Sequence, residues 1–182
     1  MAVGSAVAGV ALALAPAGGA HADQAPPSAQ SPGVEAGPSA TVMRFVIRGK
    51  SRCITVPGWS KRRGTAINLW DCGRPQPGNQ RWGIRGPKTG NYVMYQIYNS
   101  HNKLCLNVAG GSKANGAKIV QWPCNWKNQN SSWVWMKRAK GQLLFNARSR
   151  KCLSVANGST RNGAALIQWT CNDRSPNQKI FF

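Results

Sequence analysis

Residues 117–124 read Ala-Lys-Ile-Val-Gln-Trp-Pro-Cys, and residues 164–171 read Ala-Ala-Leu-Ile-Gln-Trp-Thr-Cys, nearly the same phrase 47 residues later. A more divergent copy, Ile-Asn-Leu-Trp-Asp-Cys, ends at Cys72. A phrase that recurs at a fixed period indicates a repeat architecture, in which each copy belongs to one supersecondary unit. The sequence therefore predicts three units of roughly 45–50 residues each.

The cysteine spacing supports the same three units. The six cysteines form three consecutive pairs whose members are 19 residues apart, namely Cys53 and Cys72, Cys105 and Cys124, and Cys152 and Cys171. We expect one disulfide within each pair, because this spacing without a second nearby ligand does not fit a zinc site. Metal binding is the alternative, and the sequence otherwise predicts no metal site and no cofactor.

Each unit has the pattern of short strands. The residues after the first cysteine of each pair alternate apolar and polar side chains, as a half-buried strand does, in segments 53–56, 105–108 and 152–155. Turn-forming Asn-Gly and Gly-Ser steps follow in the second and third units. The chain then returns through segments 67–70, 119–122 and 166–169. No segment shows a sustained 3.6-residue period, so the sequence predicts an all-β fold.

The first 42 residues differ in composition from the rest. Residues 6–15 are an uninterrupted apolar run, and Ala20-His21-Ala22 then offers the small residues that a signal peptidase reads. Ten apolar residues are too few to span a bilayer. We expect a signal peptide over 1–22, a flexible Pro/Ser/Ala/Gly linker over 23–42, a folded domain over 43–182, and secretion. A disordered tail on a cytoplasmic protein is the alternative.

The charge is strongly one-sided. The chain has 24 Lys and Arg against 4 Asp and Glu, a formal net charge of +20, and only Asp71 and Asp173 offset the positive charge of residues 43–182. Such a field attracts polyanions, including nucleic acid, anionic glycans and acidic wall polymers. The shortage of acids argues against an enzyme, because glycoside hydrolysis uses two carboxylates on one substrate and these two lie in different repeats.

The motifs together resemble the ricin B-type lectin family. They are the apolar-polar-Val phrase after a cysteine, the Trp two residues before the second cysteine, and a closing phrase at 79–82, 130–133 and 177–180. The resemblance implies a β-trefoil of three QxW-type repeats with pseudo-threefold symmetry. It also implies that Trp82 and Trp133, with Ile180 as the apolar substitute, lie in a shared core.

In that family each repeat can form a shallow sugar site. The resemblance implies candidate carbohydrate-binding residues Thr55, Asn68, Trp70, Asn79 and Gln80 in the first repeat, Asn107, Trp122 and Asn130 in the second, and Ser154, Trp169, Asn177 and Gln178 in the third. The family's Asp, two positions after the first cysteine, is Thr55, Asn107 and Ser154 here. Neutral acceptors form weaker hydrogen bonds than a carboxylate, so we expect weak sites that act together by multivalency.

Several alternatives remain open from the sequence. Trp70, Trp122 and Trp169 could stack on sugar or pack over the disulfides, and Trp59 and Trp126 in turn regions are further candidate contacts. The first repeat keeps the most complete polar set. We expect a secreted lectin without catalytic activity that binds glycans or glycoconjugates, with anionic ones among the candidates. The alternatives are a polyanion binder that uses the trefoil as a charged scaffold, and an accessory subunit of a toxin or hydrolase.

Overall fold

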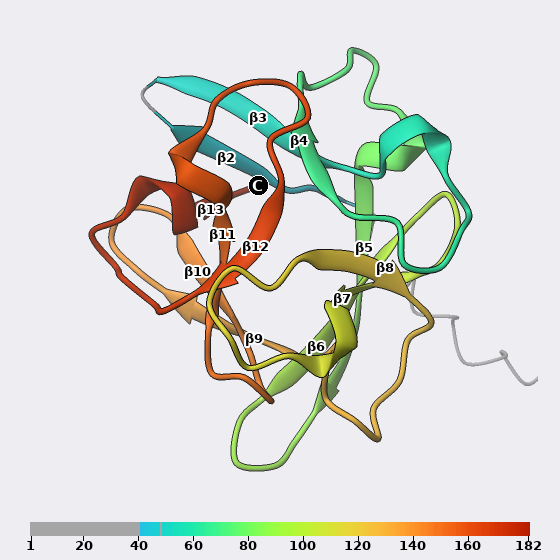
Figure 1. The fold of residues 1–182 in the computed structure, drawn as a ribbon, viewed down its shortest axis with the longest axis vertical. Helices are drawn as coiled ribbons and strands as arrows, with labels where there is room; N and C mark the ends of the chain where they lie inside the picture. Colours follow the sequence, from blue (N-terminus) through green and yellow to red (C-terminus); the bar gives the residue numbers. More distant parts are fainter. Residues whose placement is uncertain (1–40, 48) are drawn as a thin grey trace, which may run out of the picture. The chain divides into compact units, whose positions relative to one another are not determined.

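The computed structural model of this protein describes residues 41–47 and 49–182. The expected signal peptide and the linker up to residue 40 lie outside the described residues. The described part contains thirteen strands and five 3-10 turns, without an α-helix (Figure 1). No helix among these residues is long and apolar enough to cross a membrane. The all-β prediction is confirmed.

Each repeat contributes four strands. The first contains β2 (Arg44–Ile47), β3 (Lys50–Thr55), β4 (Asn68–Trp70) and β5 (Arg81–Lys88). The second contains β6 (Met94–Asn99), β7 (Cys105–Val108), β8 (Ile119–Trp122) and β9 (Trp133–Lys137). The third contains β10 (Gln142–Asn146), β11 (Cys152–Val155), β12 (Leu166–Trp169) and β13 (Ile180–Phe181). An extra strand, β1 (Thr41–Val42), precedes Met43, so the two residues before Met43 are also part of the fold.

The outer strands of the repeats close into a ring. β5, β6, β9, β10, β13 and β2 pair in that order, and β1 closes the ring because it precedes β2 and pairs with β5. The remaining strands form three hairpins, β3–β4, β7–β8 and β11–β12, which lie around a common centre in Figure 1. Isolated bridges such as Ala66 with Val120 join one hairpin to the next. This arrangement is the predicted β-trefoil.

The closing residues of the repeats meet in one core. Trp82, Trp133 and Ile180 are fully buried, as predicted. The indole Nε1 of Trp82 donates to the Ile54 carbonyl at 2.9 Å, and that of Trp133 donates to the Leu106 carbonyl at 2.9 Å. A buried Trp needs such a partner for its N–H, so each indole ties its own repeat's first hairpin strand to the core.

The three predicted disulfides are confirmed. Cys53–Cys72, Cys105–Cys124 and Cys152–Cys171 are bonded, and no free cysteine occurs among the described residues. In each hairpin the first cysteine lies opposite the exposed Trp, for example Cys105 opposite Trp122. The disulfides therefore fix the end of the hairpin from which that Trp projects.

The glutamines of the repeated phrase connect neighbouring repeats. Gln121 is fully buried, and its Nε2 donates to the carbonyls of Ser60 and Arg62 at 3.0 and 2.7 Å. Gln168 makes the equivalent pair of bonds to the turn of the second repeat, both at 2.8 Å. Leu69 occupies this position in the first repeat. The Gln of Gln-Trp-x-Cys therefore belongs to the architecture.

Candidate functional site

Three tryptophans stand on the surface at equivalent places. Trp70, Trp122 and Trp169 end β4, β8 and β12, and they are 46%, 45% and 47% exposed. Each ring lies against a turn glycine of another repeat, Trp70 against Gly163, Trp122 against Gly64 and Trp169 against Gly116. This packing uses only part of each indole. The rest of each ring is open to a ligand.

In the second repeat the Trp lines a cavity with all the other predicted residues of its repeat, whereas Trp169 of the third repeat lines a larger cavity with Asn177 and Gln178 but without Ser154. The second-repeat cavity of about 390 Å³ is lined by Gly64, Asn107, Ala109, Gly110, Val120, Trp122, Asn128 and Asn130. It unites Asn107, Trp122 and Asn130, the three residues that the sequence predicts for this repeat. Its volume lies within the range of small-molecule sites, about 300–1,000 Å³.

The amides of this cavity have free hydrogen-bonding capacity. Asn107 is only 4% exposed, yet no described residue hydrogen-bonds its side-chain amide. The Oδ1 atom of Asn130 is also buried without a partner. Buried polar groups are normally paired, and leaving one unpaired costs about 1–3 kcal/mol. The two amides are therefore prepared to bind a polar ligand.

One glycine leaves room for the Asn130 amide. A Cβ atom added to Gly111 would lie 2.8 Å from both Nδ2 and Oδ1 of Asn130. Gly111 also has a φ of +61°, in the left-handed region that favours glycine. The turn thus permits a close approach that no other residue would allow.

The polar residues of the first repeat are largely committed to one another. The Thr55 hydroxyl donates to the Cys53 carbonyl at 2.9 Å and accepts from Gln80 Nε2 at 3.1 Å. Asn79 Nδ2 donates to the Val56 carbonyl at 3.0 Å, although its Oδ1 and that of Asn68 lack partners. Its polar set is complete in sequence, but most of its groups serve the fold.

The polar residues of the third repeat are also engaged. Ser154 is buried, and its hydroxyl accepts from Asn177 Nδ2 at 3.2 Å. Asn177 donates in addition to the Val155 carbonyl at 3.2 Å and accepts from the Ser175 hydroxyl. Ile167, two residues before Trp169, has an apolar side chain that cannot hydrogen-bond a ligand. Trp169 is therefore the main open group of this set.

In Gln80 and Gln178 both the oxygen and the nitrogen of the side-chain amide hydrogen-bond backbone groups. Gln80 accepts from the Gly73 N–H at 2.9 Å and donates to the Asp71 carbonyl at 2.8 Å. Gln178 makes the equivalent two bonds at 2.8 and 3.0 Å. Both side chains are buried, so we assign them to the loop that follows the second cysteine.

Two further tryptophans differ in their surroundings. Trp59 is exposed, with its ring edge-on to His101 at 5.1 Å between centroids, and it occupies a left-handed position with a φ of +53°. Trp126 is half-buried against an apolar cluster that includes Met94, and the Lys88 ammonium lies 5.8 Å from its ring centre. Trp59 is thus the more accessible of the two.

No charged side chain lines the second-repeat cavity, and one basic side chain, Arg148, lies beside it. Arg148 donates to the carbonyls of Gly111 and Asn128 at 3.3 and 3.5 Å, which places its guanidinium at the edge. The ion pair of Arg52 with Asp71, at 2.8 Å, is the only salt bridge among the described residues. The cavity itself is therefore neutral, within a positive surface.

Sequence reasoning missed the wall that another repeat supplies. Gly64 belongs to the turn of the first repeat, and only the packing of the hairpins brings it to Trp122. Asn128 lies in the loop before the closing phrase and carries no motif. The Gly-rich composition of residues 109–111 was the only available signal for the turn that forms the cavity floor.

Known proteins resemble this chain in sequence and in fold. Residues 41–180 match the sequence profile of the ricin-type β-trefoil lectin domain. No curated protein sequence matches the chain. Three similar solved structures are the designed threefold-symmetric protein ThreeFoil (25% identity, TM-score 0.65, 76% of this chain and 95% of that one), the Rhizoctonia solani agglutinin (18%, 0.65, 82% and 96%) and an exo-β-1,3-galactanase from Clostridium thermocellum (21%, 0.67, 79% and 30%).

Proposed function

This chain belongs to the ricin-type β-trefoil lectin domain family, and from that membership we propose that it binds carbohydrate without catalysis, chiefly through the second-repeat cavity. One observation carries the proposal. The unpartnered amides of Asn107 and Asn130 lie in the same cavity as the half-exposed Trp122.

These groups match the chemistry of a pyranose. A sugar ring has an apolar face of C–H groups, which stacks on a flat aromatic ring, and a rim of hydroxyls that needs fixed polar partners. Trp122 offers the ring, Asn107 and Asn130 offer donors and acceptors, and Val120 and Ala109 add apolar wall. Because both polar partners are neutral, a single site of this kind binds weakly.

The proposal includes export from the cell. The three disulfides suit an oxidising compartment, where such bonds persist. The apolar run at residues 6–15 and the small residues at 20 and 22 support a signal peptide over 1–22. In this proposal residues 23–40 act as a flexible linker ahead of the lectin domain, because Thr41 and Val42 already belong to β1.

The charge favours a second candidate function. With 24 Lys and Arg and 4 Asp and Glu, the chain attracts nucleic acid or acidic wall polymers regardless of any sugar cavity. A third candidate is an accessory module of a toxin or hydrolase. The chain corresponds to 30% of the galactanase chain and 17% of a mosquitocidal holotoxin, so it resembles one part of each of these larger proteins.

A glycan array tests the primary proposal. Wild-type protein, Trp122→Ala, Trp70→Ala and Trp169→Ala are compared on it at low salt and at about 0.5 M salt, where the Debye length is about 4 Å. We expect Trp122→Ala to lose about tenfold or more of its affinity for uncharged glycans, because the stacking surface is removed. The two matched substitutions should retain most of it.

Thermal unfolding provides the control for this array. All three tryptophans are about half exposed, so the three variants should unfold at similar temperatures. Equal retention of binding by Trp122→Ala would contradict the proposed site. Hits confined to sulfated or phosphorylated glycans that disappear at high salt would favour the polyanion function instead.

A further inference from the structure

A cavity of about 490 Å³, which we call the β5–β6 cavity, contains none of the candidate sugar-binding residues. The turn between β5 and β6, the loop before β9 and the turn between β10 and β11 all contribute to it. Its lining consists of Lys88, Thr89, Gly90, Asn91, Tyr92, Met94, Gln129, Ala147 and Arg150. It shares no residue with the second-repeat cavity, so it is a separate space.

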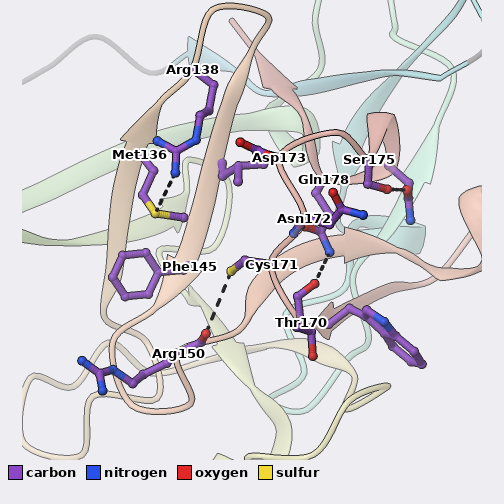
Figure 2. Close-up of a pocket in the computed structure, with 13 residues that line it drawn as sticks. Met136, Arg138, Phe145, Arg150, Thr170, Cys171, Asn172, Asp173, Ser175 and Gln178 are labelled. Atoms are coloured by element: carbon purple, nitrogen blue, oxygen red, sulfur yellow. Dashed lines mark hydrogen bonds between the residues drawn. The ribbon is translucent and has the colours of Figure 1, made fainter.

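The guanidinium of Arg150 faces the β5–β6 cavity. Arg150 also lines the larger cavity of about 780 Å³ beside the Cys152–Cys171 disulfide, but Figure 2 shows its side chain directed away from Cys171. Its Nη2 atom donates a hydrogen bond to the hydroxyl of Tyr92, and its guanidinium lies 5.9 Å from the centre of that ring. Tyr92 lines the β5–β6 cavity and is not part of the larger one. The charge of Arg150 is therefore available to the β5–β6 cavity.

Packing fixes both the ring of Tyr92 and the guanidinium beside it. Tyr92 meets Phe145 of β10 edge-on, with ring centroids 5.2 Å apart, a geometry that aromatic pairs prefer. The Tyr92 hydroxyl then holds Arg150 through a hydrogen bond, which also raises the pKa of Arg150 above its ordinary value. Arg150 therefore stays cationic, and its guanidinium keeps further N–H groups for a ligand.

One buried side chain organises the two loops on which Gln129 and Arg150 lie. The Oδ1 atom of Asn146, which is fully buried, accepts from the backbone N–H groups of Arg148 and Ser149, both at 3.1 Å. Its Nδ2 atom donates to the Gln129 carbonyl at 3.3 Å. The backbone N–H of Arg150 in turn donates to the Asn146 carbonyl at 2.8 Å. Since both loops are bonded to one residue, this part of the cavity is shaped before a ligand arrives.

Lys88 brings a second positive charge to the cavity. It ends β5 opposite Met94 of β6, after a register shift that begins at Arg85. Its ammonium lies 5.8 Å from the ring centre of Trp126, within the range of cation–π contacts. Such a contact orients the ammonium without neutralising its charge.

No acid offsets these two charges. The lining includes neither Asp nor Glu, and neither Lys88 nor Arg150 forms a salt bridge with a described residue. Two like charges in one cavity repel each other, and a bound anion would relieve that repulsion. The Tyr92 hydroxyl accepts from Arg150 and keeps its own proton to donate, while Thr89 and Asn91 add exposed donors. The cavity is thus rich in donors and positive charge.

We propose that the β5–β6 cavity binds a phosphate group, independently of the sugar site proposed above. A phosphate monoester carries a charge of about −1.5 to −2 at pH 7 and has three strong acceptor oxygens. The planar fork of Arg150 suits two of these oxygens, and Lys88 and the Tyr92 hydroxyl serve the remaining charge and acceptor. A carboxylate, with a single charge and two oxygens, would leave one cation unpaired. The cavity volume lies within the range of small-molecule sites, about 300–1,000 Å³, so the group that carries the phosphate also has room.

An NMR titration with inorganic phosphate at fixed ionic strength tests this proposal through the backbone amides of the protein. We expect the largest shifts at residues 88–94 and 147–150, which line or adjoin the cavity. Acetate is the monoanionic comparison and should bind at least about tenfold more weakly, because it pairs with only one of the two cations. Shifts spread evenly over the basic surface, or equal affinity for acetate, would overturn the proposal.

Two pairs of variants separate the cavity from general charge. Arg150→Asn removes the guanidinium, and Asn tolerates the φ of +58° at this position, whereas Arg174→Asn removes the same charge from an exposed residue outside the lining. Lys88→Gln and Lys140→Gln form the second pair, because both lysines are exposed and only Lys88 lines the cavity. We expect about a tenfold loss of phosphate affinity in Arg150→Asn, at least about threefold in Lys88→Gln and little change in the two controls. Equal losses within each pair would contradict a defined site.

A thymidine oligonucleotide with and without a 5′-phosphate distinguishes two sources of the phosphate group. If the 5′-phosphate tightens binding and Arg150→Asn removes the gain, the cavity takes the phosphorylated end of a nucleic acid. If the two forms bind alike while inorganic phosphate still shifts the cavity residues, the cavity takes a small phosphorylated molecule. Trp122→Ala should bind phosphate as the wild type does, because Trp122 does not line this cavity. No phosphate binding to the wild type would overturn this inference and leave the proposed sugar site standing.

Discussion

The residues two positions after the first cysteine show how similar chemistry can serve different ends. Thr55 and Ser154 have hydroxyls that take part in hydrogen bonds within their own repeats. Asn107 occupies the same position on β7, yet no described residue hydrogen-bonds its amide. The difference lies in the closing phrases, since Gln80 reaches Thr55 and Asn177 reaches Ser154, whereas neither Asn130 nor Ser131 bonds Asn107.

Two turn glycines give a sharp test at this scale. Gly111→Ala should weaken sugar binding, because the new Cβ would lie 2.8 Å from the Asn130 amide and would displace it. Gly58→Ala is the matched control, since it has a similar φ of +55°, has nothing within 4 Å of its added Cβ and does not line the second-repeat cavity. Both changes should lower the free energy of unfolding by about 1 kcal/mol through the left-handed backbone.

The measurements are calorimetric affinity and urea unfolding on both variants. Only Gly111→Ala should lose affinity for the uncharged glycan identified on the array. A similar loss in Gly58→Ala would show that lowered stability, and not the position of Asn130, decides binding.

At the scale of elements, the sequence was most informative about what lies within one hairpin. The 19-residue cysteine spacing and the alternating segments predicted the disulfides and the strands of each repeat, because these features depend on local pattern. It could not show that Gly64 of one repeat forms a wall for Trp122 of the next. It also could not show that the amides of Gln80 and Gln178 hydrogen-bond the backbone, because those bonds depend on loop geometry.

The side chain of Gln121 on β8 hydrogen-bonds the turn of the first repeat, so its loss should lower the stability of the fold. Gln121→Leu introduces the residue type that Leu69 places at the equivalent position of the first repeat. The variant loses the bonds to the Ser60 and Arg62 carbonyls, at 3.0 and 2.7 Å, and the bond that Gln121 Oε1 accepts from Asn102 Nδ2 at 2.6 Å. We expect the free energy of unfolding to fall by about 3 kcal/mol, or about 1 kcal/mol for each bond. Urea denaturation measures this change.

The same substitution should also affect sugar binding in the second-repeat cavity. Residues 60–64 carry Gly64, against which the Trp122 ring packs, so loosening this turn should also weaken sugar binding. Unchanged stability in Gln121→Leu would mean that the lost bonds are replaced without cost and that Gln121 does not stabilise the contact between the two repeats.

At the scale of the whole molecule, charge and shape act independently. The second-repeat cavity is lined without any charged side chain, whereas the basic residues are distributed over the surface around it. Binding in the cavity depends on stacking and on neutral hydrogen bonds, which salt affects little. Capture of a polyanion depends on displaced counterions, which salt affects strongly. The two modes can therefore be separated in one protein.

Salt titration measures that separation directly. Binding of a fluorescent single-stranded oligonucleotide should weaken linearly in log–log form between about 50 and 200 mM salt, with a slope near −0.7 for each phosphate contacted. Replacing Lys61, Arg62 and Arg63 by Gln should make the slope shallower by up to about 2, because three contacts are lost. Over the same range, affinity for an uncharged glycan should stay constant. A saturating amount of that glycan should leave the oligonucleotide bound, whereas its displacement would show that the polyanion occupies the cavity and that both ligands share one site.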